Sequence, residues 1–551
     1  MKFLIKMLKS LTLVIFILSN TYLSAQNIVF NWQNCILGYE NEEFDVCPHD
    51  IVNTGDGFLM VLTYQTPVSA VPPEICTTDI WLVKLDKNGN FLWDKFFGGS
   101  KNESPGLIIK SGDGNYYIIG ATSSSDGDIG YDPYPNSADF WVLKIDSIGN
   151  LIWERIIGGT SGERLDNTDA YSESDGGIVF IGTTLSNDGD ITQNYGTYDM
   201  WMVKLNADGS KAWDFSAGTP GFEYCAAMIP TSDGGYLLGG NGTPVEGGNI
   251  SCVSSSLSKP DGIILKLDSN RNIEWQQCLQ GSEYDGVGAL LETQNGYIIG
   301  LWSSSNDGDF ANSGYHFGSD LVLRRTDYSG NLIWQKCYGG SKDEYIGKIF
   351  NLSDGNIMVF GYVNSIDGDV TGLHYDPAYP QYTYRDIWML KIKAENGDIL
   401  WQRCIGANDI DDFTEGIIQI NDSDYVICAQ TQYGMMGDIA CGPYPSNKLW
   451  SWVMSVTDTV TWTNLPDYGE NIHEVHLSPN PANENLLIDI PEHLRTNAIN
   501  VEIINSFGVT LKKTELDGKI PFLQINDLQP GIYLLKLDNG KMKTIKRFIK
   551  I

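Results

Sequence analysis

The chain has 551 residues, ten cysteines and a formal charge of −33, and it is rich in glycine, tyrosine and tryptophan. The first 25 residues carry +3 and residues 476–551 carry +2, which leaves −38 on residues 26–475. Phosphate binding needs clustered Lys and Arg, so this charge disfavours nucleic acid and anionic membrane surfaces as partners. Cations, neutral glycans or basic proteins fit the charge better.

The N-terminus predicts a cleaved secretory signal peptide over residues 1–25. Three lysines precede an apolar run from Leu11 to Leu18, and small and polar residues then lead to Ala25. A transmembrane anchor is the alternative, but a helix needs about 20 apolar residues to cross a bilayer. We therefore expect a mature chain that begins at Gln26 and carries no transmembrane segment.

Most of the mature chain repeats itself about every 60 residues. One copy contains, in order, Asp139, Trp141, Lys144, Trp153 and Gly158. Short apolar runs bounded by Gly, Asn and Asp indicate β-hairpins, and four strands per period indicate a β-propeller blade. The strands expected in this copy cover residues 107–110, 116–121, 140–145 and 151–157.

The copies predict an all-β protein with a seven-bladed β-propeller over residues 26–462. The chain starts with the second half of a repeat at Trp32 and ends with a first half at Trp452. We expect the two halves to form one composite blade, in which residues 26–65 make the outer part and residues 448–456 complete it. A linear β-solenoid is the alternative, but it gives no reason for complementary half-repeats at the two ends.

The Asp, Gly and Trp spacing resembles the tryptophan-docking repeats of the pyrroloquinoline-quinone (quinoprotein) propeller family. Residues 393–401 are the nearest copy, with Lys393 where that family has Asp. Quinone enzymes of the family usually carry vicinal cysteines, and this sequence has none. The resemblance therefore implies shared architecture rather than shared chemistry. A weaker likeness to sialidase Asp-boxes fails, because the Asp-to-Trp spacing is too long.

The C-terminal part begins after a polar, non-repetitive segment at 463–475 that we interpret as a linker. Residues 476–551 resemble the type A C-terminal sorting domain of the Bacteroidetes type IX (Por) secretion system, through motifs near both ends. The resemblance implies handling by the type IX machinery and a secreted or cell-surface location after Sec export. The residues that match its sorting signal are Pro479, Asn480, Pro481, Gly531, Tyr533, Lys536 and Lys550.

The strand pattern of this region gives an independent prediction. Alternating apolar residues at 501–504 and 533–537 favour a small Ig-like β-sandwich. An ordinary Ig-like binding module is the alternative to a sorting domain.

Catalytic motifs are missing from the sequence. It contains no HExxH, no GxSxG and no phosphate-binding glycine loop. Three histidines of the repeat region, His49, His316 and His374, are far apart along the chain. A glycosidase pair among the many carboxylates stays open, and we assign no catalytic residue.

The longest segment of each repeat joins the second strand to the third, so all copies should lie on one face of the propeller. Several copies contain Asp-Gly-Asp, which suits Ca²⁺ but is also a plain turn former. We favour the turn and keep Ca²⁺ as the candidate cofactor. Its candidate ligands are Asp126, Asp128, Asp188, Asp190, Asp307, Asp309, Asp367 and Asp369.

The same loops contain clusters of tyrosine, aspartate and proline. Exposed tyrosine beside aspartate can stack on a sugar or bind a surface protein, and self-packing of the loop is the alternative. The candidate ligand-binding residues are Tyr131, Asp132, Tyr134, Tyr375, Asp376, Tyr379 and Tyr444. Three functions stay open: a binding module that acts through this face, an extracellular glycan-degrading enzyme, and a structural surface-layer component.

An acidic residue stands ten positions after each repeat tryptophan. A cation-binding ring is one interpretation, but unpaired carboxylates would repel one another, so we favour a local brace that accepts backbone N–H bonds in the Gly-Gly turn or pairs with a basic residue of its sheet. The seven acids are Glu42, Glu103, Glu163, Glu223, Asp285, Glu344 and Asp411.

The cysteines predict disulfides in an exported protein. We expect each bridge to join a strand to a loop, because equivalent positions on different blades are too far apart. The candidate pairs are Cys47–Cys76, Cys225–Cys252 and Cys428–Cys441.

Overall fold

The computed structural model divides the chain into two compact units, Met1–Asp458 and Thr459–Ile551. In the first unit it describes residues 28–36, 46–67, 76–165, 169–254, 256–375, 384–407, 413–431, 437–440 and 450–458. In the second unit it describes residues 476–478, 485–490, 498–505, 510–517, 522–526, 528, 531–539 and 543–550. The expected signal peptide and linker lie outside the described residues.

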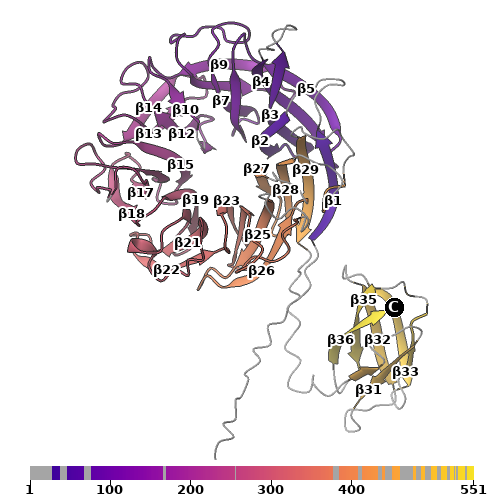
Figure 1. Cartoon of the computed structure of the whole chain (residues 1–551). Coiled ribbons are helices and arrows are strands. Elements are labelled where there is room, and N and C mark those ends of the chain that lie inside the picture. The colour runs from indigo at the N-terminus through magenta and orange to yellow at the C-terminus, as the bar shows by residue number, and fades with distance from the viewer. Residues whose placement is uncertain are drawn as a thin grey trace, which may run out of the picture. The chain divides into compact units, whose positions relative to one another are not determined.

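The described part of the first unit consists of antiparallel sheets arranged in a ring (Figure 1). Six sheets follow one another along the chain, and a seventh combines the two ends of the unit. The strands of the first three are β2 (Val46–Asn53), β3 (Gly57–Pro67), β4 (Cys76–Asp86) and β5 (Phe91–Phe97); β6 (Glu103–Lys110), β7 (Tyr116–Thr122), β8 (Asp139–Ile145) and β9 (Leu151–Ile157); and β10 (Glu163–Arg164), β11 (Ala170–Ser172), β12 (Ile178–Thr184), β13 (Asp199–Leu205) and β14 (Lys211–Ala217).

The next three sheets repeat the same pattern. Their strands are β15 (Glu223–Pro230), β16 (Tyr236–Gly242), β17 (Asp261–Leu267) and β18 (Ile273–Leu279); β19 (Asp285–Thr293), β20 (Gly296–Ser303), β21 (Asp320–Thr326) and β22 (Leu332–Tyr338); and β23 (Glu344–Asn351), β24 (Ile357–Val363), β25 (Asp386–Ile392) and β26 (Ile399–Ile405). A short 3₁₀ helix, η1 (Gly308–Phe310), lies between β20 and β21. In each sheet the first strand lies nearest the centre of the ring and the last lies at its rim (Figure 1).

The last sheet closes the ring with strands from both ends of the unit. β27 (Phe413–Gln419), β28 (Asp424–Thr431) and β29 (Trp450–Asp458) come from its C-terminal end, and β1 (Ile28–Ile36) pairs with β29 as the outermost strand. This composite sheet excludes the linear solenoid. The expectation that residues 26–65 make its outer part is correct for β1 and wrong for β2 and β3, which begin the next sheet.

The tryptophans of the two half-repeats have different structural roles. Trp141 on the third strand is fully buried, and its indole N–H donates to Glu154 on the fourth strand at 3.1 Å. Trp93 on a fourth strand packs against the next sheet, where a Cβ on Gly149 would lie 2.8 Å from its ring. Gly149 has a φ of 76°, which suits glycine in this hairpin. The tryptophans thus stabilise both the interior of a sheet and its contact with the neighbouring sheet.

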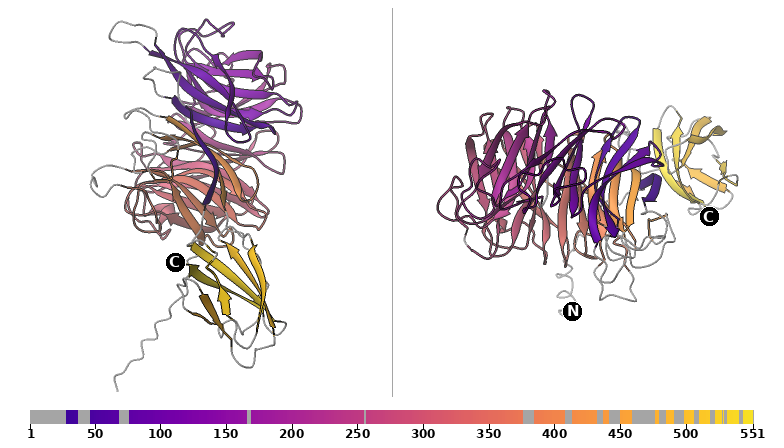
Figure 2. Two further views of the ribbon diagram at one scale, coloured as in Figure 1. Left: turned by 90° about the vertical axis from the view of Figure 1, so that its right-hand side faces the viewer. Right: turned by 90° about the horizontal axis from the view of Figure 1, so that it is seen from above.

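The strands run between the two faces of the ring (Figure 2). Because neighbouring strands are antiparallel, the segments that join the second to the third strand lie on one face, and the short hairpins lie on the other. Buried side chains fill the space between adjacent sheets, as Leu59 and Val61 do with Ile108 and Ile118. The fold is that of a β-propeller.

The second unit consists of two antiparallel sheets around one core. One contains β30 (His476–Ser478), β31 (Asn485–Asp489) and β34 (Phe522–Gln524), and the other contains β33 (Thr510–Asp517), β32 (Ala498–Asn505), β35 (Gly531–Asp538) and β36 (Lys543–Lys550). Leu486, Ile488, Val501, Leu523 and Leu535 are buried between them.

One disulfide joins Cys252, in a loop, to Cys278 on β18. It has the expected strand-to-loop form, but the predicted Cys225–Cys252 pair is wrong. Cys225 is a buried thiol, and burial raises its pKa well above the usual range. Cys47 and Cys428 carry thiols and form no disulfide, so the predicted Cys47–Cys76 and Cys428–Cys441 pairs are wrong as well.

Candidate functional site

The segments between the second and third strands are the longest of the propeller, and their face is called the long-loop face below. The described loops cover residues 123–138, 185–198, 243–254, 256–260, 304–319 and 364–375. The short segments that lead from one sheet to the next, such as 98–102, lie on the same face.

The Asp-Gly-Asp turns fasten the long loops to these inter-sheet segments. Asp126 accepts the backbone N–H of Ser100 at 2.8 Å, and Asp128 accepts that of Gly98 at 3.0 Å. Hydrogen bonds of the same kind join Asp188 to Thr160, Asp190 to Gly158, Asp307 to Ser282, Asp309 to Gln280, Asp367 to Ser341 and Asp369 to Gly339.

This geometry gives every candidate calcium ligand a structural partner. Within the described residues, no group of three or more His, Cys, Asp or Glu side chains could hold a metal ion. The turn interpretation therefore accounts for the repeated motif, and Ca²⁺ binding stays a prediction.

The tyrosine-proline cluster in the loop between β7 and β8 contains one exposed tyrosine, Tyr131, and one packed tyrosine, Tyr134. Tyr131 is 78% exposed. Tyr134 packs against the next long loop, where a Cβ on Gly189 would lie 2.6 Å from its hydroxyl oxygen. Burial, aided by the nearby carboxylates of Asp190 and Asp139, raises the pKa of Tyr134 to about 12. Asp132 accepts the backbone N–H of Tyr134 and shapes the turn.

The second tyrosine cluster is described in part. Tyr375 is 39% exposed, and its ring meets Tyr384 edge-on at 6.4 Å. Asp376, Tyr379 and Tyr444 lie outside the described residues. The structure thus does not test whether the predicted tyrosines form one site.

Exposed apolar side chains occur on several loops of the long-loop face. Leu257 is 72% exposed and Phe317 is 71% exposed, on loops of different sheets. A sequence search for tyrosine clusters missed both. Other large side chains exposed on this face are Val253, Tyr284 and Ile366.

The acids that follow the repeat tryptophans are buried braces. Glu163 accepts the backbone N–H of Gly159 at 3.0 Å and the hydroxyl of Thr184 at 2.9 Å. Glu103, Glu223, Asp285 and Glu344 are likewise buried and accept hydrogen bonds from backbone N–H or hydroxyl groups. The brace interpretation is confirmed for the four glutamates, which accept backbone N–H bonds, whereas Asp285 accepts the hydroxyls of Ser303 and Ser305. Glu42 and Asp411 lie outside the described residues.

Burial is the largest cause of the raised pKa values of three of these acids and of three aspartates that begin a third strand; they are Glu223, Asp285, Glu344, Asp139, Asp199 and Asp320. Burial and the adjacent carboxyl group of Glu163 raise the pKa of Asp139 to about 8. The pKa is raised to about 6 for Asp199 and Asp320, and to about 7 for Glu223, Asp285 and Glu344. These neighbouring carboxyl groups are buried and recur from sheet to sheet. The two carboxyl groups of a glycosidase, in contrast, must be accessible to a substrate.

Two histidines that are distant in sequence have equivalent positions on the long-loop face. His374 Nδ1 lies 2.8 Å from Asp386 Oδ2, and its Nε2 lies 3.7 Å from Asp438. The hydrogen bond to Asp386 is the main cause that raises the pKa of His374. His316 lies between Asp320 and Asp369 in the same way. Tyr195, four residues before Asp199, occupies the matching position, so alignment of the repeats could have revealed the pattern.

Another cluster of polar side chains lies at the inner strands of the ring. Asp50 accepts the backbone N–H of Ile108 in the next sheet, and its other oxygen lies 3.6 Å from Lys348 Nζ. Asp169 likewise accepts the N–H of Met228. These side chains hold adjacent inner strands together.

The described residues of the predicted sorting signal make structural contacts within the second unit. Tyr533 is buried in its core, and Lys536 Nζ lies 3.6 Å from Glu502. Gly531 is paired with Lys550, which is buried. Pro479, Asn480 and Pro481 lie outside the described residues.

Comparison with protein families identifies the second unit. Residues 476–551 match the family of secretion system C-terminal sorting domains (Por secretion tail). The chain is thus a β-propeller protein with a type IX sorting tail, which indicates export to the cell surface or the extracellular space. In the described part of the chain, no helix has the length and apolar character needed to span a membrane.

No curated protein matches the chain, whereas several solved structures are similar to it. The β-propeller domain of the trilobed protease from Pyrococcus furiosus is 10% identical, with a TM-score of 0.35 over 70% of this chain and 89% of that chain. A Synechocystis apocarotenoid oxygenase is 12% identical, with a TM-score of 0.30 over 54% and 62%. The plexin A4 extracellular region is 8% identical, with a TM-score of 0.45 over 92% and 62%. The chain therefore spans less than two thirds of the last two.

Proposed function

We propose that this protein is a secreted or cell-surface binding module, built as a seven-bladed propeller with an Ig-like sorting tail and a cleaved signal peptide. In this proposal the type IX machinery, found in Bacteroidetes, exports the chain, and the long-loop face binds a partner outside the cell. The observation that carries the binding role is the exposure of Tyr131, Leu257 and Phe317 on long loops of three different sheets. Large apolar side chains at such positions characterise interaction surfaces.

A neutral glycan is the partner that best fits this face. Exposed aromatic rings such as Tyr131 and Phe317 offer flat apolar surfaces to the faces of sugar rings. The charge of −38 on residues 26–475 would repel a polyanionic ligand. The buried carboxyl groups are fixed by structural hydrogen bonds, so they give no specific support to a glycan-degrading enzyme.

A glycan array probed with the mature chain, with and without Ca²⁺, tests the proposal. We expect binding to at least one neutral glycan, unchanged by Ca²⁺ because the Asp-Gly-Asp oxygens already accept N–H bonds. Absence of glycan binding, together with retained binding to intact cells, would instead indicate a surface protein as partner. Absence of both would favour a structural surface-layer role.

A further inference from the structure

A basic residue near the end of the third strand is paired with a carboxylate in most sheets. Lys144 Nζ lies 2.7 Å from Asp113, on the hairpin between the first two strands of its sheet. Lys84 lies 2.7 Å from Asp56 in the same way. The pairing recurs between Lys204 and both Glu173 and Asp175, between Lys266 and Asp233, and between Lys391 and Asp354. Each of these cations is therefore neutralised within its own sheet.

Arg325 has the same position in the sheet β19–β22 but lacks such a partner. Its hairpin, residues 293–296, has Asn295 where the equally long hairpin 54–57 has Asp56. Within the described residues, Arg325 makes no ion pair. Its Nη1 donates to Ala394 O at 2.6 Å, and its Nε is buried without a hydrogen-bond partner. A guanidinium has five N–H donors, so most of its capacity is unused.

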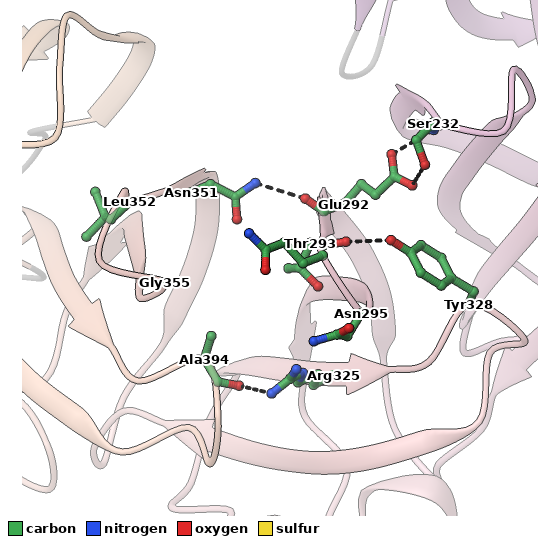
Figure 3. A pocket seen from close by; sticks show the side chains of 11 residues that line it. Ser232, Glu292, Thr293, Asn295, Arg325, Tyr328, Asn351, Leu352, Gly355 and Ala394 are labelled. Atoms are coloured by element: carbon green, nitrogen blue, oxygen red, sulfur yellow. Dashed lines mark hydrogen bonds between the residues drawn. The ribbon is translucent and has the colours of Figure 1, made fainter.

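A pocket of about 550 Å³ opens beside this guanidinium, on the face opposite the long loops (Figure 3). Glu292 also lines it, but its carboxylate accepts the N–H and the hydroxyl of Ser232 and points away from Arg325. The charge of Arg325 is thus uncompensated where the pocket opens. Other lining groups are the amides of Gln294, Asn295 and Asn351 and the ring of Tyr328.

The side chains that line the pocket indicate which kind of ligand it can bind. A planar guanidinium binds a carboxylate through two parallel hydrogen bonds. The exposed amides of Gln294 and Asn295 can hydrogen-bond hydroxyl groups, and the Tyr328 ring, which is 44% exposed, can cover an apolar sugar face. The acidic protein repels polyanions, which favours a ligand with a single carboxylate. We infer that this pocket binds a saccharide that carries one carboxylate, such as a hexuronate, through Arg325.

This site is separate from the long-loop face, so its test is independent of the proposed function. Glucuronate, glucose and acetate are titrated into the full mature chain at pH 7 and followed by calorimetry or NMR. Glucuronate should bind, with glucose and acetate each about tenfold weaker or more, since each lacks one half of the recognised chemistry. No binding of glucuronate, or equal binding of acetate, would overturn the inference.

Two variants locate the site on the chain. Arg325→Gln should weaken glucuronate binding about tenfold or more. Asn295→Asp should have the same effect while keeping or raising the melting temperature, because it restores the ion pair that the Asp56 hairpin makes with Lys84. Arg155→Gln, which removes an exposed charge elsewhere, should bind as the wild type does. Wild-type affinity in Asn295→Asp would contradict the inference even if Arg325→Gln failed to fold.

Discussion

The carboxyl groups of Asp139 and Glu163 lie side by side although they belong to neighbouring sheets, since a Cβ on Gly158 would lie 2.1 Å from Asp139 Oδ1 and 2.3 Å from Glu163 Oε2. Two buried carboxylates in contact cannot both be ionised at low cost, so this pair holds a proton near neutral pH. Related buried acids recur around the described ring, which makes the joints between sheets sensitive to pH.

Asp139→Asn should reduce this sensitivity. Burial and Glu163 raise the pKa of Asp139 to about 8, above its unfolded value of about 4. The folded state therefore binds the proton more tightly, and the stability that this adds is lost as pH rises from about 4 through 8. Asparagine resembles the protonated acid, so the variant should match the wild type at pH 5 and exceed it at pH 8.5 in urea unfolding. An equal loss of stability at both pH values would rule out the shared proton.

Asp113→Asn should show the opposite pH dependence. Burial raises the pKa of Asp113, but hydrogen bonds from Lys144 and Asn115 outweigh it and lower the pKa to about 2. The pair then stabilises the fold above pH 4 and ceases to do so as pH falls through 2. Asp113 is 39% exposed, so we expect a loss of only about 1 kcal/mol at pH 7. The difference from the wild type should shrink between pH 4 and pH 2; a constant difference would show that the ion pair is not its cause.

Asp188→Asn tests whether the Asp-Gly-Asp loops bind Ca²⁺. Asp188 accepts the backbone N–H and the hydroxyl of Thr160, so the variant should lower the melting temperature slightly. Millimolar CaCl₂ should leave the melting temperature of both proteins unchanged. If CaCl₂ stabilised the wild type and not the variant, the Asp-Gly-Asp loops would be metal sites after all.

Removal of residues 476–551 tests the export route. The type IX sorting tail directs the protein out of the cell, so the truncated chain should accumulate in the periplasm. It should keep the thermal transition of the propeller, because that unit has its own core. Continued appearance of the truncated protein in the medium would show that export depends on another signal.

The repeat spacing was sufficient to predict the strands, because each apolar run stands between Gly and Asn turns. The sequence does not distinguish a turn within a sheet from a segment that leads to the next sheet. For this reason the sequence-based expectation places β2 and β3 in the closing blade, although they begin the next sheet. One neighbour of each histidine, Asp369 for His316 and Asp438 for His374, comes from the next sheet, and contacts of this kind are visible only once the ring is formed. The sequence shows that Asn295 stands where the hairpin 54–57 has Asp56, so the loss of an ion pair with Arg325 is predictable. That Arg325 borders a pocket is visible only in the folded structure.

In the proposed function, the long-loop face binds the partner. The most direct measurement is the affinity of the mature chain for the neutral glycan that binds best on the array. The comparison is between the wild type, a Tyr131→Ser/Phe317→Ser variant, and a Phe91→Ser/Leu332→Ser control on exposed rim strands. We expect the long-loop variant to bind about tenfold more weakly or worse, while the control binds as the wild type does. Equal binding by all three proteins would contradict the assignment of function to this face.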